Sequence, residues 1–107
     1  MRGYLILDGQ RLGEVDFKIL DESMGAIGGQ LKPFPAYEMY KKQIQKLTQL
    51  KGIANIEDFG FRISLGDAIV NDIGGGIGVT DLEELDEIEV EAAGLDRETI
   101  MLILESN

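Results

Sequence analysis

Apolar residues recur at the spacing of an α-helix within residues 35–52, PAYEMYKKQIQKLTQLKG. At about 100° per residue, Tyr40, Ile44 and Leu47 fall on one stripe, and lysines and glutamines occupy most of the opposite face. This is the pattern of an amphipathic helix that packs against a sheet. Burial of each of these three apolar side chains is expected to stabilise the fold by roughly 2 kcal/mol.

The ends and flanks of this segment agree with a single helix. Pro35 suits a first helical turn, where its missing N–H would have no partner. Gly52 can adopt the left-handed conformation that often ends a helix. Ala36 and Tyr37 lie on the same apolar stripe, and Met39 and Leu50 widen it on one side. We expect the rings of Tyr37 and Tyr40 to pack in the core, with their hydroxyl groups at its rim.

Alternation of apolar and polar residues predicts a hairpin at the start of the chain. Residues 1–8 are largely apolar and end at Asp8-Gly9, a dipeptide typical of hairpin turns. Residues 12–20 then alternate with the period of a half-buried strand. The apolar positions of this run include Val15, Phe17 and Ile19.

Shorter patterns predict the remaining elements. Further strands are expected at residues 26–31, 59–65, 68–73, 87–91 and 99–104. The last of these, TIMLIL, is a continuous apolar run typical of a central strand. Residues 79–85 are expected to contain one helical turn, because Thr80 and Glu83 have the spacing of a capping box.

These patterns together predict one α+β domain over residues 1–107. It would contain roughly six to seven strands and one amphipathic helix, and most connections are short enough to require antiparallel neighbours. We therefore expect a curved antiparallel sheet, or a partly open barrel, with the helix packed across it.

Composition narrows the chemistry that the chain can perform. The 107 residues contain no cysteine and no histidine. Disulfides, thiolate nucleophiles, a Ser–His–Asp triad and the commonest transition-metal ligands are therefore excluded. We expect no metal, no cofactor and no enzymatic activity. No window is apolar enough to span a membrane and no leader-like segment opens the sequence, so we expect a soluble, cytoplasmic protein without a membrane partner.

The net charge of −10 is unevenly spread along the chain. Residues 1–56 contain eight basic and six acidic side chains, a net charge of +2, whereas residues 57–107 contain two basic and fourteen acidic ones, a net charge of −12. A nucleic-acid-binding surface needs the opposite sign, so we expect no nucleic-acid partner. The excess acid either keeps the protein soluble or steers it towards a basic partner surface.

A glycine-rich segment at residues 74–78 invites comparison with phosphate-binding loops. No lysine follows these glycines, and the carboxylates of Asp81, Glu83 and Glu84 would repel a phosphate. We therefore interpret the segment as a turn, a bulge or a close approach of backbone.

Calcium binding and acid–base catalysis are two further uses of the acidic residues. Hard oxygen ligands for calcium would come from Asp72, Asp81, Glu83, Glu84 and Asp86. The spacing of an EF-hand loop is absent, so only composition points to calcium. Paired carboxylates could also act as in glycosidases, but exposed carboxylates on a strand usually form a solvated face.

The predicted acidic strand at residues 87–91 is a more specific feature than the acidic composition. In residues 87–91, Ile88 and Val90 alternate with three carboxylates, those of Glu87, Glu89 and Glu91. At a sheet edge these charges would discourage aggregation. They would equally present an acidic surface to a basic protein. We predict a partner-binding site that comprises Glu83, Glu84, Glu87, Glu89 and Glu91.

The sequence as a whole favours a non-catalytic small acidic protein that binds a basic protein surface. An immunity protein, an inhibitor or a regulatory accessory protein is the most concrete version, by analogy of kind. Two alternatives stay open: a half-barrel that encloses a small ligand, and a structural subunit of a homo-oligomer or larger assembly.

Overall fold

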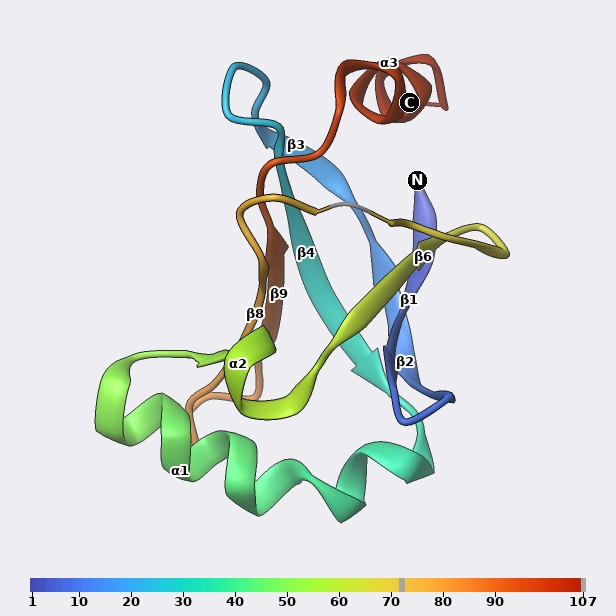
Figure 1. Ribbon diagram of the computed structural model, residues 1–107. Helices are drawn as coiled ribbons and strands as arrows, with labels where there is room; N and C mark the ends of the chain where they lie inside the picture. Colours follow the sequence, from blue (N-terminus) through green and yellow to red (C-terminus); the bar gives the residue numbers. More distant parts are fainter. Residues whose placement is uncertain (72, 107) are drawn as a thin grey trace.

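The computed structural model, which describes residues 1–71 and 73–106, is a curled antiparallel sheet with a helix at each end (Figure 1). The described chain contributes nine strands, in the order β5-β8-β9-β4-β2-β1-β6-β7, with β3 paired to β4. The strands are β1 (Arg2–Leu7), β2 (Gln10–Asp16), β3 (Lys18–Asp21), β4 (Ala26–Pro33), β5 (Ala54–Asn55), β6 (Arg62–Leu65), β7 (Ala68–Ile69), β8 (Ile77–Asp81) and β9 (Ile88–Ala92). The α+β class and the half-barrel shape agree with the prediction, and the strand count exceeds it.

Two predicted hairpins are present. β1 pairs with β2, and the turn between them holds Asp8 at φ 52° and Gly9 at φ 75°. Two consecutive positive φ angles match the type I′ turn, whose twist suits a hairpin. β6 and β7 form the second hairpin. β6 begins at Arg62, later than predicted, because a short helix, α2 (Ile56–Phe59), precedes it.

The predicted strand over residues 12–20 is divided at Phe17. β2 pairs with the C-terminal half of β4, whereas β3 pairs with its N-terminal half. Phe17 is buried in the core, and its N–H donates a hydrogen bond to the carbonyl of Met1, 2.8 Å away. Gly29 of β4 permits the close crossing at this corner, because a Cβ there would collide with the carbonyl of Asp16. The corner contributes to the curl of the sheet.

The predicted helix forms in two parts rather than one. A 3₁₀-helix, η1 (Pro35–Met39), leads into α1 (Lys41–Lys51), and Tyr40 lies between them. Gly52 ends α1 in the left-handed conformation, as predicted. α1 crosses one end of the curled sheet in Figure 1, where Ile44 is buried and Leu47 is partly buried. The helix therefore packs across the sheet as expected.

The C-terminal segment corrects the prediction of a central strand at residues 99–104. These residues lie in a helix, α3 (Arg97–Ser106), one side of which packs near β3. Asp96 caps this helix, because its Oδ1 accepts a hydrogen bond from the N–H of Thr99 at 2.8 Å. The prediction of a single helix is thus also wrong.

The helical turn predicted over residues 79–85 is absent from the described chain. The first part of this segment belongs to β8, which pairs with β9 on one side and with β5 on the other. Thr80 pairs with Glu89 of β9, and this strand pairing outweighs its local capping preference, as tertiary context often does. Residues 82–87 join β8 to β9 through a turn, in which the N–H of Leu85 donates a hydrogen bond to the carbonyl of Leu82 at 3.0 Å, and no helix forms there.

The glycine-rich segment lies where three stretches of backbone meet. The N–H of Gly75 donates a hydrogen bond to the carbonyl of Ala93 at 2.8 Å, and the N–H of Gly94 donates to the carbonyl of Met24 at 3.0 Å. Gly94 has a φ of 81°, and a Cβ at this position would collide with the backbone nitrogen of Gly75. The interpretation as a close approach of backbone is therefore confirmed.

Gly94→Ala is expected to lower the free energy of unfolding by about 2 kcal/mol, because the substitution combines a left-handed conformation with a backbone clash. Urea unfolding followed by circular dichroism measures the change. Gly9→Ala is the matched control, since Gly9 has a φ of 75° and nothing within 4 Å of an added Cβ. The control should cost about 1 kcal/mol. Equal losses in both variants would show that the crossing tolerates a side chain.

Candidate functional site

The acidic strand lies inside the sheet rather than at its edge. β9 pairs with β4 on one side and with β8 on the other, so edge protection does not explain its charges. Ile88 and Val90 are buried in the core, whereas Glu89 and Glu91 are exposed. The alternation predicted for this strand is confirmed, and its two glutamates project from the outer face of the sheet.

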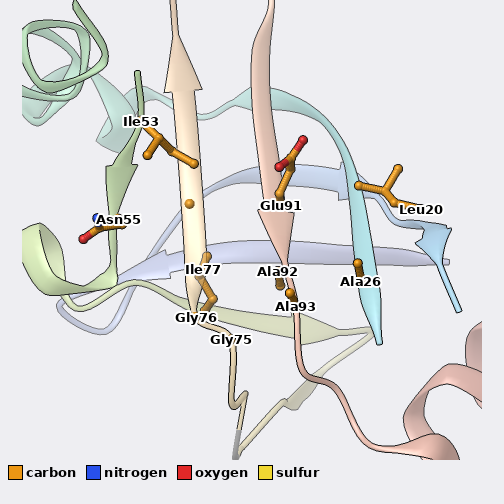
Figure 2. A pocket seen from close by; sticks show the side chains of 11 residues that line it. Leu20, Ala26, Ile53, Asn55, Gly75, Gly76, Ile77, Glu91, Ala92 and Ala93 are labelled. Atoms are coloured by element: carbon orange, nitrogen blue, oxygen red, sulfur yellow. The ribbon is translucent and has the colours of Figure 1, made fainter. Parts of the chain in front are cut away.

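Glu91 is flanked by a glycine on each neighbouring strand. The register places it opposite Gly28 of β4 and opposite Gly78 of β8. Because neither neighbour has a side chain, no cross-strand group covers the flanks of the glutamate. Figure 2 shows the Glu91 side chain between Ile53 on one side and Leu20 on the other. The Glu91 side chain is exposed, and the two glycines beside it leave room for side chains from strands further away.

Two apolar side chains border this position. Leu20 lies over Gly28, because a Cβ there would come within 2.8 Å of the Leu20 Cδ1. Ile53 lies over Gly78, where an added Cβ would collide with the Ile53 Cδ1. Together with Glu91 they line an open cleft of about 290 Å³ (Figure 2). We call this the Glu91 cleft and define it by Leu20, Ile53, Gly78 and Glu91.

A carboxylate between two apolar side chains suits a long cationic side chain. Lysine and arginine have an aliphatic stem, which Leu20 and Ile53 can contact, and a charged end, which Glu91 can bind. Arginine can form two parallel hydrogen bonds with a carboxylate, and such charge-assisted bonds are roughly twice as strong as neutral ones. An anionic ligand would be repelled.

Glu89 lies two residues before Glu91 on the same face of β9 and extends the acidic surface along this strand. It is paired with Gln30 of β4 and with Thr80 of β8, so its neighbours are polar rather than small. Residues two apart on a strand share one face and lie roughly 7 Å apart. The outer face of β9 therefore offers two carboxylates in line, and Glu91 is the one that lines the cleft.

The other predicted site residues lie away from the cleft. Glu83 and Glu84 belong to the turn after β8 and line a separate groove of about 320 Å³. Lys42 and Lys46 of α1 line the same groove, so positive charges there offset the negative charges of the two glutamates. Glu87 precedes β9 and is exposed. The structure thus divides the predicted site into a pair on β9, an acidic turn, and Glu87 between them in sequence.

Asp81 does not join the acidic surface. Its side chain is 2% exposed and faces the core at the end of β8. The Tyr37 hydroxyl donates a hydrogen bond to its Oδ2 at 2.7 Å, and Nε2 of Gln45 donates to its Oδ1 at 3.3 Å. The N–H of Asp81 donates to Oγ1 of Thr48 at 3.1 Å. This buried network joins η1 and α1 to the sheet.

Tyr37 is more deeply placed than predicted, whereas Tyr40 is not. The Tyr37 hydroxyl is buried against Asp81 rather than at the rim of the core. Burial, followed by the hydrogen bond to the Asp81 carboxylate, raises the pKa of the Tyr37 hydroxyl far above its ordinary value. The Tyr40 hydroxyl is exposed, as predicted, and donates to Oδ2 of Asp8 at 3.2 Å.

The calcium hypothesis finds no support in the arrangement of carboxylates. Within residues 1–71 and 73–106, no three acidic side chains come close enough together to hold a metal ion. Asp81 already accepts two hydrogen bonds in the core. Asp72 lies outside the described residues.

No protein-family model matches this sequence, and comparisons with curated proteins and with solved structures find no significant match. Of the helices in the described part of the chain, none is both long and apolar enough to cross a membrane. A function has to be inferred from the surface of the molecule itself.

Sequence reasoning located the carboxylates of the cleft but missed its borders. Leu20 and Ile53 reach Glu91 only because β3 pairs with β4 and β5 pairs with β8. Such pairing between distant segments leaves little trace in the local pattern. The one local sign was Gly28 within a predicted strand, since a glycine there indicates a close approach.

Proposed function

We propose that the protein is a non-catalytic binding protein that docks onto a basic protein surface, as an inhibitor, an immunity protein or a regulatory accessory protein would. The Glu91 cleft carries this proposal, because an accessible carboxylate lies there between two apolar side chains. An arginine or lysine of the partner would insert with its stem against Leu20 and Ile53. The remaining contacts would spread over the polar surface around Glu89.

The charge distribution supports a basic partner. Residues 57–107 carry a net charge of −12, and β9 and the turn before it belong to this part of the chain. A field of this sign attracts a cationic surface before contact and accelerates association. We therefore expect salt to slow association, whereas the contacts in the cleft determine how long the complex lasts.

The interior of the sheet favours this proposal over a half-barrel that encloses a small ligand. Phe17, Phe61 and Ile63 are fully buried side chains of the core. A ligand inside the barrel would need that volume to be empty. The cleft lies instead on the outer face, where β9 carries its glutamates.

A short capped peptide with one arginine between two leucines tests the cleft directly. In NMR titrations it is expected to shift the backbone amide signals of Gly78 and Ala92, which line the cleft. The same peptide with glutamine in place of arginine should shift them much less. Glu91→Gln is expected to weaken binding of the arginine peptide roughly fivefold, because it removes the charge and keeps the shape.

Glu38→Gln is the matched control, since Glu38 is an exposed residue of η1 outside the cleft, and it should leave the affinity unchanged. Simultaneous reversal of Glu87, Glu89 and Glu91 to lysine should abolish binding of the arginine peptide while the thermal midpoint and the circular dichroism spectrum stay those of wild type. Equal binding of the two peptides, or binding retained by the triple variant, would refute a cation site at Glu91.

A further inference from the structure

α3 carries apolar residues on more than one side, yet only one side of it is covered. Ile100 and Ile103 are buried, whereas Met101, Leu102 and Leu104 are 43%, 49% and 41% exposed. Helices with apolar residues on all sides are normally covered on all sides. In Figure 1, α3 stands at the end of the sheet opposite α1, beside β3. Within the described residues, the outer side of α3 stays open to solvent.

A groove beside α3 enlarges this uncovered surface. It has a volume of about 620 Å³ and lies between α3 and the turn at residues 22–25. Met24, which is 64% exposed, and Met101 both line it. Flexible methionine side chains adapt to the shape of a protein partner. Arg97 and Met101 line both this groove and the outer side of α3, so the two form one continuous surface.

Two of the three charged residues of α3, Arg97 and Glu105, are self-complementary about Met101, and the third, Glu98, is exposed on the same flank as Glu105. Arg97 lies four residues before Met101, and Glu105 lies four residues after it. At about 100° per residue, the two charged residues flank Met101 by about 40° on opposite sides, and Leu104 lies about 60° away. Both charged side chains are exposed, and among the described residues neither forms an ion pair within the chain.

We propose that the outer side of α3 binds a second copy of this chain, with the two α3 helices antiparallel and crossing at Met101. A two-fold axis then passes through the contact, so Arg97 of each copy faces Glu105 of the other. The two Met101 side chains meet at the centre. A parallel arrangement would bring like charges together, so the charge pattern favours a second copy in the antiparallel orientation.

The contact is small, which limits the strength of the dimer. A helix of ten residues is about 15 Å long, so α3 alone buries less than the roughly 800 Å² per partner of a standard interface. The adjoining groove adds to this area. We therefore expect a reversible, concentration-dependent dimer. This surface has no lining residue in common with the Glu91 cleft, so the inference does not depend on the proposed function.

Charge reversal tests the pairing. In sedimentation equilibrium of the full chain, from about 10 µM to about 1 mM, wild type is expected to shift from monomer to dimer. Arg97→Glu and Glu105→Arg should each weaken dimerisation about tenfold, because each turns two attractive pairs into two repulsive ones. The double variant Arg97→Glu/Glu105→Arg restores both pairs in the reverse sense and should recover the wild-type dissociation constant within roughly threefold.

Glu38→Arg is the matched control, and it should leave the dimer unchanged. Circular dichroism and thermal melting establish that each variant is folded, which the exposed positions of Arg97 and Glu105 lead us to expect. A monomer at every concentration would overturn the proposal. A dimer that resists both single reversals, or that the double variant fails to recover, would overturn the antiparallel pairing of α3.

Discussion

Ile44→Asp is expected to unfold the protein at room temperature. Ile44 is 0% exposed, and α1 packs there against β8 and β5. The substitution removes about 2 kcal/mol of apolar burial and places a carboxylate in the core, which costs several kcal/mol more. Small domains are stable by only about 5–15 kcal/mol, and the sum of these two losses is comparable to the lower end of that range. Loss of the far-ultraviolet circular dichroism spectrum measures the result.

Two companion variants make this expectation quantitative. Leu50→Asp introduces the same charge on the same helix at a position that is 71% exposed, and it should change the free energy of unfolding by less than about 0.5 kcal/mol. Ile44→Ala, which can be measured even if the aspartate variant does not fold, should cost about 2–4 kcal/mol in urea unfolding. Similar stabilities for Ile44→Ala and wild type would mean that α1 does not contribute to the core.

Local patterns were sufficient for α1 and for the first hairpin. Asp8-Gly9 can take the positive φ angles of a tight turn, so the turn specifies the pairing of the two strands beside it. Helical spacing likewise placed Ile44 in the core. The break at Tyr40 was not predicted, because the sequence there has neither proline nor glycine. The stretch before Tyr40 is held by 3₁₀-type hydrogen bonds, such as the bond from the Tyr40 N–H to the Tyr37 carbonyl at 3.0 Å.

The same reasoning failed for α3, because its apolar residues lie on both sides of the helix. A continuous apolar run has no period that separates a helix from a buried strand. Ile100 and Ile103, three residues apart, face the core, whereas Met101 and Leu102 between them are exposed. Asp96 was the available indicator, since an aspartate just before such a run can act as an N-cap. A helix that leaves apolar residues exposed on one side therefore has the same continuous apolar sequence as a strand that is buried on both faces.

The candidate site divides in the same way into local and non-local parts. Alternation along β9 was enough to place Glu89 and Glu91 on one face. The cleft is deep at Glu91 because Gly28 and Gly78 lie opposite it. This register depends on the pairing of three strands, β4, β9 and β8, which the local sequence does not reveal. Composition also grouped Asp81 with the acidic turn. Strand parity turned it inward instead, because Asp81 lies two residues after the buried Val79 in β8 and therefore shares its face of the sheet.

Stability is expected to fall steeply above pH 10 because of the buried Tyr37 hydroxyl. Its pKa is raised well above the ordinary tyrosine value of about 10 by burial and by the Asp81 carboxylate. Above pH 10 the unfolded chain releases this proton while the folded chain retains it, so the unfolded state binds fewer protons. The free energy of unfolding therefore decreases with pH, by about 1.4 kcal/mol per pH unit from this residue alone. Below pH 10 the Tyr37 hydroxyl is protonated in both states, so its full contribution to the free energy of unfolding is retained.

Tyr37→Phe isolates this effect from the other groups that titrate at alkaline pH. Below pH 9 the variant should be about 1–2 kcal/mol less stable than wild type, because the buried carboxylate of Asp81 loses its hydrogen-bond donor at 2.7 Å. As the pH rises above 10, only wild type loses the stability that the protonated Tyr37 hydroxyl contributes. The free energies of unfolding of the two proteins should therefore converge, and the variant should become the more stable one between roughly pH 11 and pH 12. Urea unfolding of both proteins from pH 8 upwards measures the crossing. Parallel curves would show that the Tyr37 hydroxyl ionises as readily in the folded chain as in the unfolded one, which a hydroxyl sealed between η1 and β8 against a carboxylate could not do.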